Sequence, residues 1–372
     1  MKKVGVLGCG RISEQYLTNM TGFYKNIEVV ACADVNIENA KKRAEQFGIK
    51  AMTPEELLAD SSIDIVVVLV PTPIHATLIE KALNAGKHVY TEKTMTATLE
   101  EARKVMKLAD EKGLYFGAAP DTFMGAAYQT ARKAIDDGLI GEPISFSMNI
   151  NRNLDIMASI FEFLRLPGGG FAYDYGVYYL TAMVALFGPV EDIYSVVKNK
   201  AKVRTNCVPG TPEYGKTYNY DNESQIYALV NMENGMTGTI SMNGDSNLTD
   251  DPFFLVYGTK GILKLSCAND FGGQVEFRET PSVTDWQPKP PVILENTSPI
   301  VGENRGVGPA EMALSIEAGK KNRASKEMAY HVLDIISQMM ESSEKKQVIR
   351  VESTCERPER LTEEELKQMV DM

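Results

Sequence analysis

The residues Gly8-Cys9-Gly10 stand between a short apolar run and a segment, Ser13–Met20, with the pattern of a helix. Gly8 allows a tight turn, and Gly10 lets the backbone come close to a phosphate. The N-terminus of a helix offers N–H groups to negative charge. Because the third position of the G-x-G-x-x-G pattern is Ser13, the match is partial. This order predicts a binding site for a dinucleotide pyrophosphate, with two further contact residues directly after the turn: Arg11 and Ile12.

An acidic residue follows the second predicted strand, Ile27–Ala33. Asp34 comes at the distance from the glycines where a carboxylate accepts hydrogen bonds from both ribose hydroxyls of NAD, and its charge would repel the extra phosphate of NADP. A basic run, Lys41-Lys42-Arg43, one helix turn away keeps NADP possible. The structural alternative for Asp34 is a helix cap. The pattern favours NAD.

Two further polar segments follow predicted strands, at the sheet edge where ligands bind in such folds. Pro71-Thr72-Pro73-Ile74-His75 comes after Ile63–Val70, and Glu92-Lys93-Thr94 comes after His88–Thr91. His75 could contact the cofactor, or begin the next helix. Lys93 could hydrogen-bond a substrate hydroxyl, whereas the ordinary fate of a loop lysine is exposure to solvent. Both alternatives stay open at this point.

A third candidate segment begins with Gly168-Gly169-Gly170 and runs into a helix. Asp174 and Tyr178 lie four residues apart on one face of that helix, where a carboxylate and a phenol suit the wall of a polar cavity. The other face carries an apolar stripe that predicts core: Val177, Leu180, Val184 and Phe187. The alternatives are an N-cap for Asp174 and a packed aromatic for Tyr178. Neighbouring tyrosines, among them Tyr179, suit sugar rings and hydroxyls.

The elements that carry these residues predict two domains. Strands and helices alternate through residues 1–120, which indicates a doubly wound parallel sheet of the Rossmann type. Residues 121–372 predict an α+β domain with an open, mainly antiparallel sheet. Two hairpins support this, because turn residues join Gln225–Met232 to Met236–Met242, and Gly258-Thr259-Lys260-Gly261 joins another pair of runs.

Composition narrows the class of protein. The chain has 372 residues, of which 44% are hydrophobic, so a sizeable core is expected. A net charge of −11 argues against nucleic acid or an anionic membrane as partner. Five scattered cysteines suit a reducing cytoplasm and argue against a metal site. We expect no signal peptide and no membrane span, and therefore a cytoplasmic protein.

Taken together, these motifs resemble those of the Gfo/Idh/MocA oxidoreductases, the family of glucose–fructose oxidoreductase and inositol dehydrogenase. The resemblance rests on the glycine turn, Asp34, the Pro-Thr-Pro segment with His75, the Glu92-Lys93 pair, and the glycine run before Asp174. It extends to Ile140-Gly141-Glu142-Pro143 and to Gly258 with Gly261. It implies a Rossmann domain, a C-terminal domain whose open sheet face forms dimers or tetramers in many members, and a polyol, sugar or glycoside substrate oxidised or reduced at a secondary alcohol with NAD(P).

The resemblance also assigns roles to residues. It implies Lys93, Asp174 and Tyr178 as catalytic residues and the following as cofactor-binding residues: Gly8, Gly10, Arg11, Ile12, Asp34, Pro71, Thr72, His75, Glu92 and Lys93. Asp121 is a candidate for binding a sugar hydroxyl, and the alternative is that it caps a helix. Tyr179 is a second candidate for substrate binding.

Two departures from the family pattern matter. Thr94 stands where the family usually has proline, and Tyr178 stands where many members have histidine, which indicates a tyrosine-type subgroup. The alternative function is a dinucleotide-binding regulator without catalysis, since the family includes a co-repressor. Residues 151–166 mix charged side chains with aromatic and apolar ones, and we expect this segment to form a lid or a subunit contact.

Overall fold

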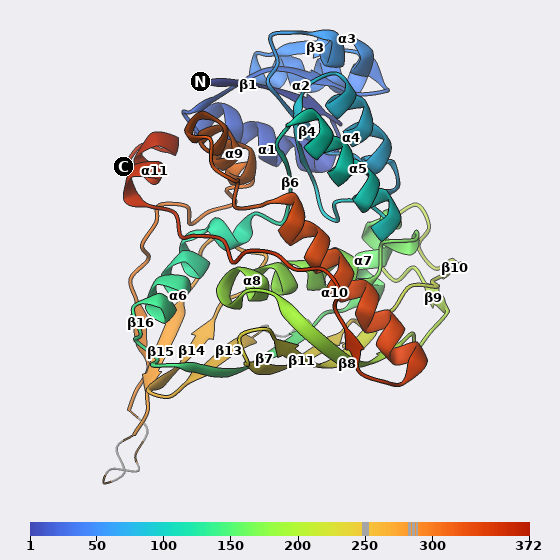
Figure 1. The fold of residues 1–372 in the computed structure, drawn as a ribbon. Helices are drawn as coiled ribbons and strands as arrows, with labels where there is room; N and C mark the ends of the chain where they lie inside the picture. Colours follow the sequence, from blue (N-terminus) through green and yellow to red (C-terminus); the bar gives the residue numbers. More distant parts are fainter. Residues whose placement is uncertain (248–252, 282–283, 285–286, 288) are drawn as a thin grey trace. The chain divides into compact units, whose positions relative to one another are not determined.

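The computed structural model describes the whole chain except residues 248–252, 282–283, 285–286 and 288 (Figure 1). The chain divides into two compact units. The first comprises Met1–Met124, Ser298–Tyr330 and Pro358–Met372, and the second comprises Gly125–Thr297 and His331–Arg357. The sequence predicts that the cofactor domain ends at residue 120 and the second domain begins at residue 121, and this boundary stays a prediction.

The first unit is built on a six-stranded parallel sheet in the order β3-β2-β1-β4-β5-β6. This is the strand order of a Rossmann fold, so the predicted fold class is confirmed. Its strands are β1 (Lys2–Leu7), β2 (Ile27–Ala33), β3 (Lys50–Met52), β4 (Ile65–Val68), β5 (His88–Thr91) and β6 (Phe116–Ala118). Its helices are α1 (Arg11–Gly22), α2 (Ile37–Phe47), α3 (Pro54–Ala59), α4 (His75–Asn84), α5 (Leu99–Lys112), α9 (Val307–Ala318) and α11 (Glu363–Met369).

Local sequence explains where these elements begin and end. All four residues of β4 are buried, as expected of a parallel strand covered on both faces. Helix α5 begins with a capping box, because Thr98 accepts from the Glu101 amide and the Glu101 side chain accepts from the Thr98 amide. It ends at Gly113, whose φ of +64° is the left-handed conformation that glycine adopts without strain.

The second unit contains a nine-stranded sheet in the order β16-β15-β14-β13-β7-β12-β11-β8-β17. Its strands are β7 (Pro143–Asn151), β8 (Val190–Lys198), β11 (Gln225–Met232), β12 (Thr237–Asn243), β13 (Phe253–Gly258), β14 (Gly261–Leu265), β15 (Val275–Glu279), β16 (Val292–Leu294) and β17 (Ile349–Arg350). Both predicted hairpins are present, β11 with β12 and β13 with β14. The sheet is mainly antiparallel, but β7 and β12 pair in parallel.

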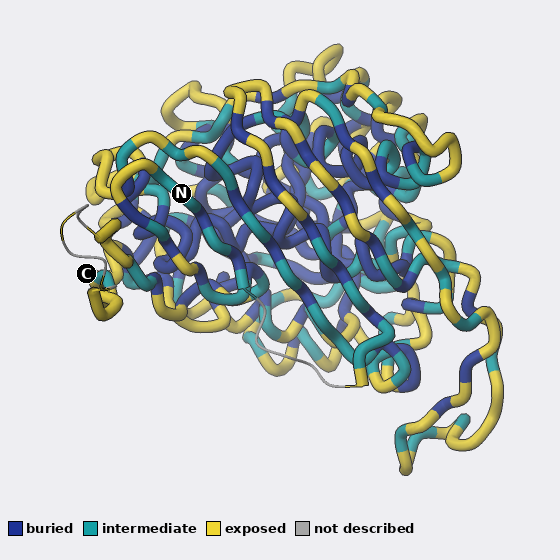
Figure 2. The backbone as a smooth tube through the Cα atoms, turned by 90° about the horizontal axis from the view of Figure 1, so that it is seen from below, coloured by how far each residue is buried: buried dark blue, intermediate teal, exposed yellow. Residues whose placement is uncertain are grey.

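Helices cover one side of this sheet. Figure 1 shows α6 (Ala126–Asp136) and α8 (Val177–Phe187) on the same side of it. All eleven residues of α8 are buried, so the predicted apolar stripe belongs to the core. Along β11 exposed and buried residues alternate, and Figure 2 shows this alternation along the strands of the sheet. The remaining elements are α7 (Leu154–Ile160), α10 (Lys326–Lys345), and the paired strands β9 (Val203–Thr205) and β10 (Thr217–Asn219).

A buried histidine joins α10 to the C-terminal segment. The Nε2 of His331 accepts from the Val190 amide at 2.9 Å, so the ring proton is on Nδ1, which lies 2.9 Å from the Ser353 hydroxyl. Ser353 donates in turn to Asp334 at 2.6 Å. Burial lowers the pKa of His331 to about 4, against the opposing effect of Asp334. The folded chain therefore holds this histidine neutral.

We expect His331 to make stability depend on pH. Because its folded pKa lies below the ordinary value of 6.5, its contribution is fully present above that value and is lost as the pH falls toward 4. Between pH 7 and pH 5 the free energy of unfolding should fall by about 2 kcal/mol through this group. His331→Gln should remove that part of the pH dependence in urea unfolding. Equal slopes in both proteins between pH 7 and pH 5 would contradict this assignment.

Candidate functional site

The glycine turn lies between β1 and α1. Gly8 has a φ of +104°, and its amide donates to the Ala33 carbonyl at 2.8 Å. A Cβ at Gly8 would lie 2.5 Å from the Leu69 carbonyl oxygen, so only glycine fits. Gly10 is the N-cap of α1. Among the residues that the structure describes, no side chain caps this helix and no heavy atom lies within 4 Å of where a Gly10 Cβ would be. Ser13 donates its hydroxyl to the Gly10 carbonyl at 2.6 Å, which gives the third position of the pattern a structural role.

Asp34 is hydrogen-bonded to this turn. One carboxylate oxygen accepts from the Cys9 amide at 2.8 Å, and the other accepts from the Asn36 amide at 2.9 Å. The N-cap of α2 is Asn36, whose side chain accepts from the Glu38 amide, so Asp34 is not the helix cap. The strand end and the glycine turn are thereby fixed to one another.

Two residues of the basic run after Asp34, Lys41 and Arg43, pair with neighbouring side chains. Arg43 donates to Glu14 and to Gln46, each at 2.8 Å, and approaches the Gly10 carbonyl at 3.4 Å. Lys41 pairs with Glu38 at 2.8 Å. The Arg43 guanidinium thus supports the glycine turn.

The loop after β4 contains a 3₁₀ turn, Thr72–Ile74, and leads directly into α4. His75 is the first residue of α4 and is fully buried. Its Nδ1 lies 2.8 Å from the Thr94 carbonyl and its Nε2 lies 2.8 Å from the Val70 carbonyl. Burial lowers the pKa of His75, although both carbonyls act in the opposite direction. The ring therefore ties the loop after β4 to the loop after β5.

The segment around Lys93 is anchored on both sides. The buried Glu92 accepts from the Tyr16 hydroxyl at 2.8 Å and from the Lys93 amide at 3.0 Å. Thr94 is buried, and its hydroxyl donates to the Thr96 carbonyl at 2.9 Å. The Lys93–Thr94 peptide is cis. These bonds hold the backbone of Lys93 even though threonine stands where the family usually has proline.

Asp121 is bonded to the start of a distant helix. Its carboxylate accepts from the Gly308 amide at 2.9 Å and from the Gly306 amide at 3.3 Å, at the N-terminus of α9. Burial raises the pKa of Asp121 to about 6, while the amides and Arg305 act to lower it. Of the two alternatives from the sequence, these contacts favour a helix cap, on α9 rather than on the helix that follows Asp121.

In the second unit, Asp174 and Tyr178 lie in one continuous helical segment. A π-helical turn, Ala172–Gly176, contains Asp174 and leads into α8, where Tyr178 is the second residue. The Asp174 amide donates to the Gly170 carbonyl at 2.8 Å, and the residue lies within the turn rather than at the N-cap. Tyr178 is 8% exposed, so most of its ring is packed.

Arg152 accompanies this pair, and the sequence indicated it only as part of the 151–166 segment. Its guanidinium lies 3.9 Å from the Asp174 carboxylate and 4.2 Å from the centre of the Tyr175 ring. The Tyr175 and Tyr178 rings are 6.3 Å apart. Its position in the sequence could have pointed to it, because Arg152 directly follows β7.

Tyr179 faces elsewhere in the same unit. It is fully buried, and its hydroxyl donates to the Cys267 sulfur at 3.4 Å. Burial raises the pKa of Tyr179 well above its ordinary value. These contacts favour a packing role, and its predicted contact with substrate stays a prediction.

The described part of the chain holds neither a candidate metal site nor a helix that could span a membrane. Outside the gaps between residues 248 and 288, no three histidine, cysteine or acidic side chains are grouped so that they could hold a metal ion. No helix in the described residues is both long and apolar enough to span a bilayer.

Comparisons with known proteins agree with this arrangement. Residues 2–119 match the model of an oxidoreductase family with an NAD-binding Rossmann fold, GFO/IDH/MocA, and residues 128–264 match the C-terminal domain of the same family. An uncharacterized oxidoreductase of Schizosaccharomyces pombe is 34% identical over 165 residues, which cover 43% of this chain and 45% of that protein. The match therefore spans less than half the length of that relative.

Two further relatives align over more of the chain. The scyllo-inositol 2-dehydrogenase (NAD(+)) of Bacillus subtilis is 27% identical over 70% of this chain and 72% of its own. A levoglucosan dehydrogenase solved with NADH and L-sorbose superposes with a TM-score of 0.79 at 19% identity, over 95% of this chain and 99% of its own. Its likeness is one of fold. Because two models of one family together match most of the sequence, the chain belongs to the GFO/IDH/MocA family of NAD(P)-binding oxidoreductases.

Proposed function

We propose that the chain is an NAD-dependent oxidoreductase that interconverts a secondary alcohol and a ketone on a sugar, cyclitol or glycoside. The observation that carries the proposal is a carboxylate and a phenol, Asp174 and Tyr178, one turn apart in a mainly apolar helical segment. The names of relatives support the substrate class, since one acts on scyllo-inositol and another is a levoglucosan dehydrogenase.

The glycine turn fits a dinucleotide. The space beside Gly10 is open, no side chain caps α1, and the Asp34 carboxylate is bonded to the same turn. We assign the pyrophosphate to Gly8, Gly10, Arg11 and Ile12 and the ribose to Asp34. Further cofactor contacts fall to Pro71, Thr72, His75, Glu92 and Lys93. When bound, the nicotinamide supplies hydride transfer.

The preference for NAD over NADP follows from charge. Asp34 would repel a 2′-phosphate, and a neighbouring arginine is the usual means of accepting one. Arg43 is the arginine of the basic run after Asp34, but its guanidinium donates to Glu14 and Gln46. NADP binding would therefore require Arg43 to exchange these partners.

In this scheme three residues take part in proton transfer at the substrate hydroxyl. Tyr178 exchanges the proton of the substrate hydroxyl, and the Lys93 ammonium holds the reacting oxygen and favours the phenolate form. Asp174, with Arg152 beside it, orients Lys93 or a neighbouring hydroxyl. The roles of Lys93 and Tyr178 are exchangeable in this scheme. Tyrosine at this position supports a tyrosine-type subgroup within the family.

We also propose that the protein forms a homodimer or homotetramer through the outer face of the nine-stranded sheet. Tyr227 pairs across strands with Val196, and Leu229 pairs with Tyr194. All four side chains are at least 39% exposed. Apolar side chains gathered on adjoining strands are typical of a surface that another subunit covers.

A direct assay tests the proposed function. Absorbance at the NADH wavelength should rise when the protein is mixed with NAD and members of a panel of inositols, aldoses and glycosides, and should rise more slowly with NADP. Saturable NAD binding without turnover on any member, together with a protein that co-purifies, would instead support a dinucleotide-binding regulator.

Gly10→Ala should separate cofactor binding from folding. Because no atom lies near the added methyl group, the thermal midpoint should stay within about 2 °C of the unaltered protein. The methyl group would point into the space assigned to the pyrophosphate, so NADH affinity should fall by about tenfold or more. Gly22→Ala, at the other end of α1 and equally open, is the matched control. Unchanged NADH affinity in Gly10→Ala would remove Gly10 from the binding site.

Tyr178→Phe tests the proton carrier. Losing general acid–base catalysis should lower kcat by about 10²–10⁴-fold, while NADH affinity is retained. Tyr214→Phe, at a residue 57% exposed, is the control and should keep normal turnover. An unchanged kcat in Tyr178→Phe would exclude Tyr178 from proton transfer and leave Lys93 as the candidate.

A further inference from the structure

Asn222, Glu223 and Ser224 lie between β10 and β11, and we call these three residues the 222–224 clamp. The Asn222 side-chain amide donates to the Leu164 carbonyl at 3.0 Å and to the Leu166 carbonyl at 2.7 Å. These carbonyls belong to the chain just before the glycine run. The clamp therefore holds one end of the segment that leads to Asp174.

Glu223 holds the other end of the same segment. Its backbone carbonyl accepts from the Phe171 amide at 3.3 Å, and its carboxylate accepts from the Ala172 amide at 2.9 Å. A Cβ at Gly170 would lie 2.0 Å from a carboxylate oxygen of Glu223. The carboxylate therefore fills the space beside Gly170, and glycine is required there for the contact to exist.

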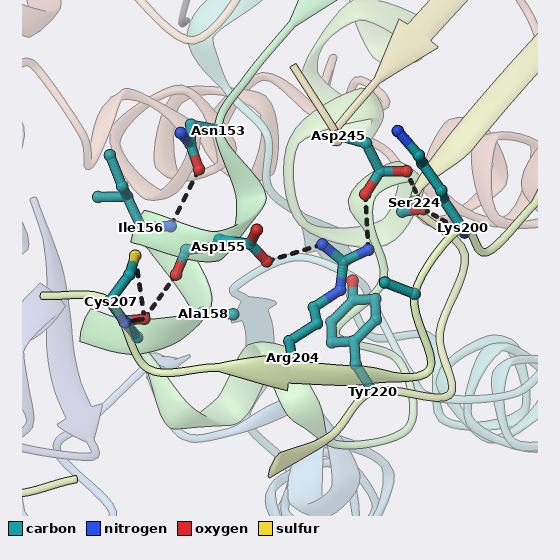
Figure 3. Close-up of polar contacts among 12 residues, drawn as sticks. Asn153, Asp155, Ile156, Ala158, Lys200, Arg204, Cys207, Tyr220, Ser224 and Asp245 are labelled. Carbon is teal, nitrogen blue, oxygen red and sulfur yellow. Dashed lines mark hydrogen bonds and ion pairs between the residues drawn. The ribbon is translucent and has the colours of Figure 1, made fainter. Parts of the chain in front are cut away.

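The third residue connects the clamp to a buried ion-pair network (Figure 3). Ser224 donates its hydroxyl to Asp245 at 2.6 Å, and Asp245 pairs with Arg204 at 2.7 Å. Arg204 also pairs with Asp155 of α7 at 2.8 Å, and its guanidinium lies 4.8 Å from the Tyr220 ring. Because a guanidinium held by two carboxylates is fixed in orientation, the clamp has a rigid support.

We infer that Glu223 is a positioning residue for the proposed reaction. Its ionised carboxylate fixes the first turn of the helical segment that carries Asp174 and, one turn later, Tyr178. Ala172 is two residues before Asp174, so a bond at the Ala172 amide restrains the same turn. The inference rests on the proposed function for its catalytic consequence, but the restraint itself can be measured independently.

The surroundings of Glu223 allow its charge to change near neutral pH. Tyr173 faces it from the π-helical turn, Tyr220 faces it from its own loop, and Arg204 lies beyond the Tyr220 ring. Among the residues that the structure describes, no lysine or arginine pairs with Glu223. Burial raises the pKa of Glu223 to about 7, although backbone amides act to lower it.

The two protonation states differ in what they can bond. An ionised carboxylate accepts from several N–H groups, whereas a protonated carboxyl turns one oxygen into a donor, which cannot pair with an amide N–H. The restraint should therefore be strong above neutral pH and weak below it. Glu223→Gln, which places a side-chain NH₂ among the same amides, should resemble the protonated form at every pH.

Amide hydrogen exchange measures the restraint directly. In the unaltered protein, the protection factor of the peptide covering residues 171–176 should rise by about tenfold from pH 6 to pH 8.5. In Glu223→Gln it should stay near the lower value throughout. Glu233→Gln, on the exposed turn between β11 and β12, is the matched control and should behave like the unaltered protein. A rise in protection that persists in Glu223→Gln would overturn the inference.

Turnover measures the catalytic consequence of the restraint by Glu223. At pH 8.5, kcat of Glu223→Gln should be lower by about 10²-fold, the cost of a small misplacement of reacting groups, with NADH affinity unchanged. At pH 6, where about a tenth of Glu223 is still ionised, the difference should narrow to about tenfold. If the unaltered protein turns over no panel member but its protection changes with pH as described, the restraint stands and the proposed function fails. If turnover occurs and Glu223→Gln matches it at pH 8.5, the positioning role is wrong.

Discussion

Carboxylates that accept hydrogen bonds from backbone amides hold several segments of the candidate site in place. Asp34 bonds to the Cys9 amide in the glycine turn, and Asp121 bonds to the Gly308 amide at the start of α9. Glu223 does the same for Ala172 at the start of the π-helical turn. Gly308 and Ala172 lie at the starts of helical segments, where the first amides have no partner within the helix. An irregular loop thereby gains the fixed geometry that catalysis and binding require.

Removing a carboxylate from water disfavours its ionised form, and this effect is present at two of these residues. For Asp121 and Glu223, burial outweighs the amides and raises the pKa, to about 6 and about 7. Charge-assisted bonds to amides favour the ionised form, and removal from water disfavours it. The balance leaves these carboxyls close to the point where a modest change in pH alters their charge.

The sequence predicted the parts of the fold that depend on local patterns. Residues close together in the sequence determine these parts: the buried run of β4, the capping box at Thr98 and the β11–β12 hairpin. The parallel pairing of β7 with β12 was not predicted, because it joins strands far apart in sequence. The same limit applied to the site. Asp34 follows a strand at a recognisable distance, but nothing near Glu223 indicates that it contacts Ala172, 51 residues earlier.

The contact between Gly170 and Glu223 also bears on how this part of the chain can evolve. The absence of a side chain at one position leaves the space that a long acidic side chain occupies at the other. Neither residue can be exchanged for a larger or shorter one without a collision or a void. Homologues should therefore change the two positions together, and a lineage that replaced the acid would be free to place alanine in the glycine run.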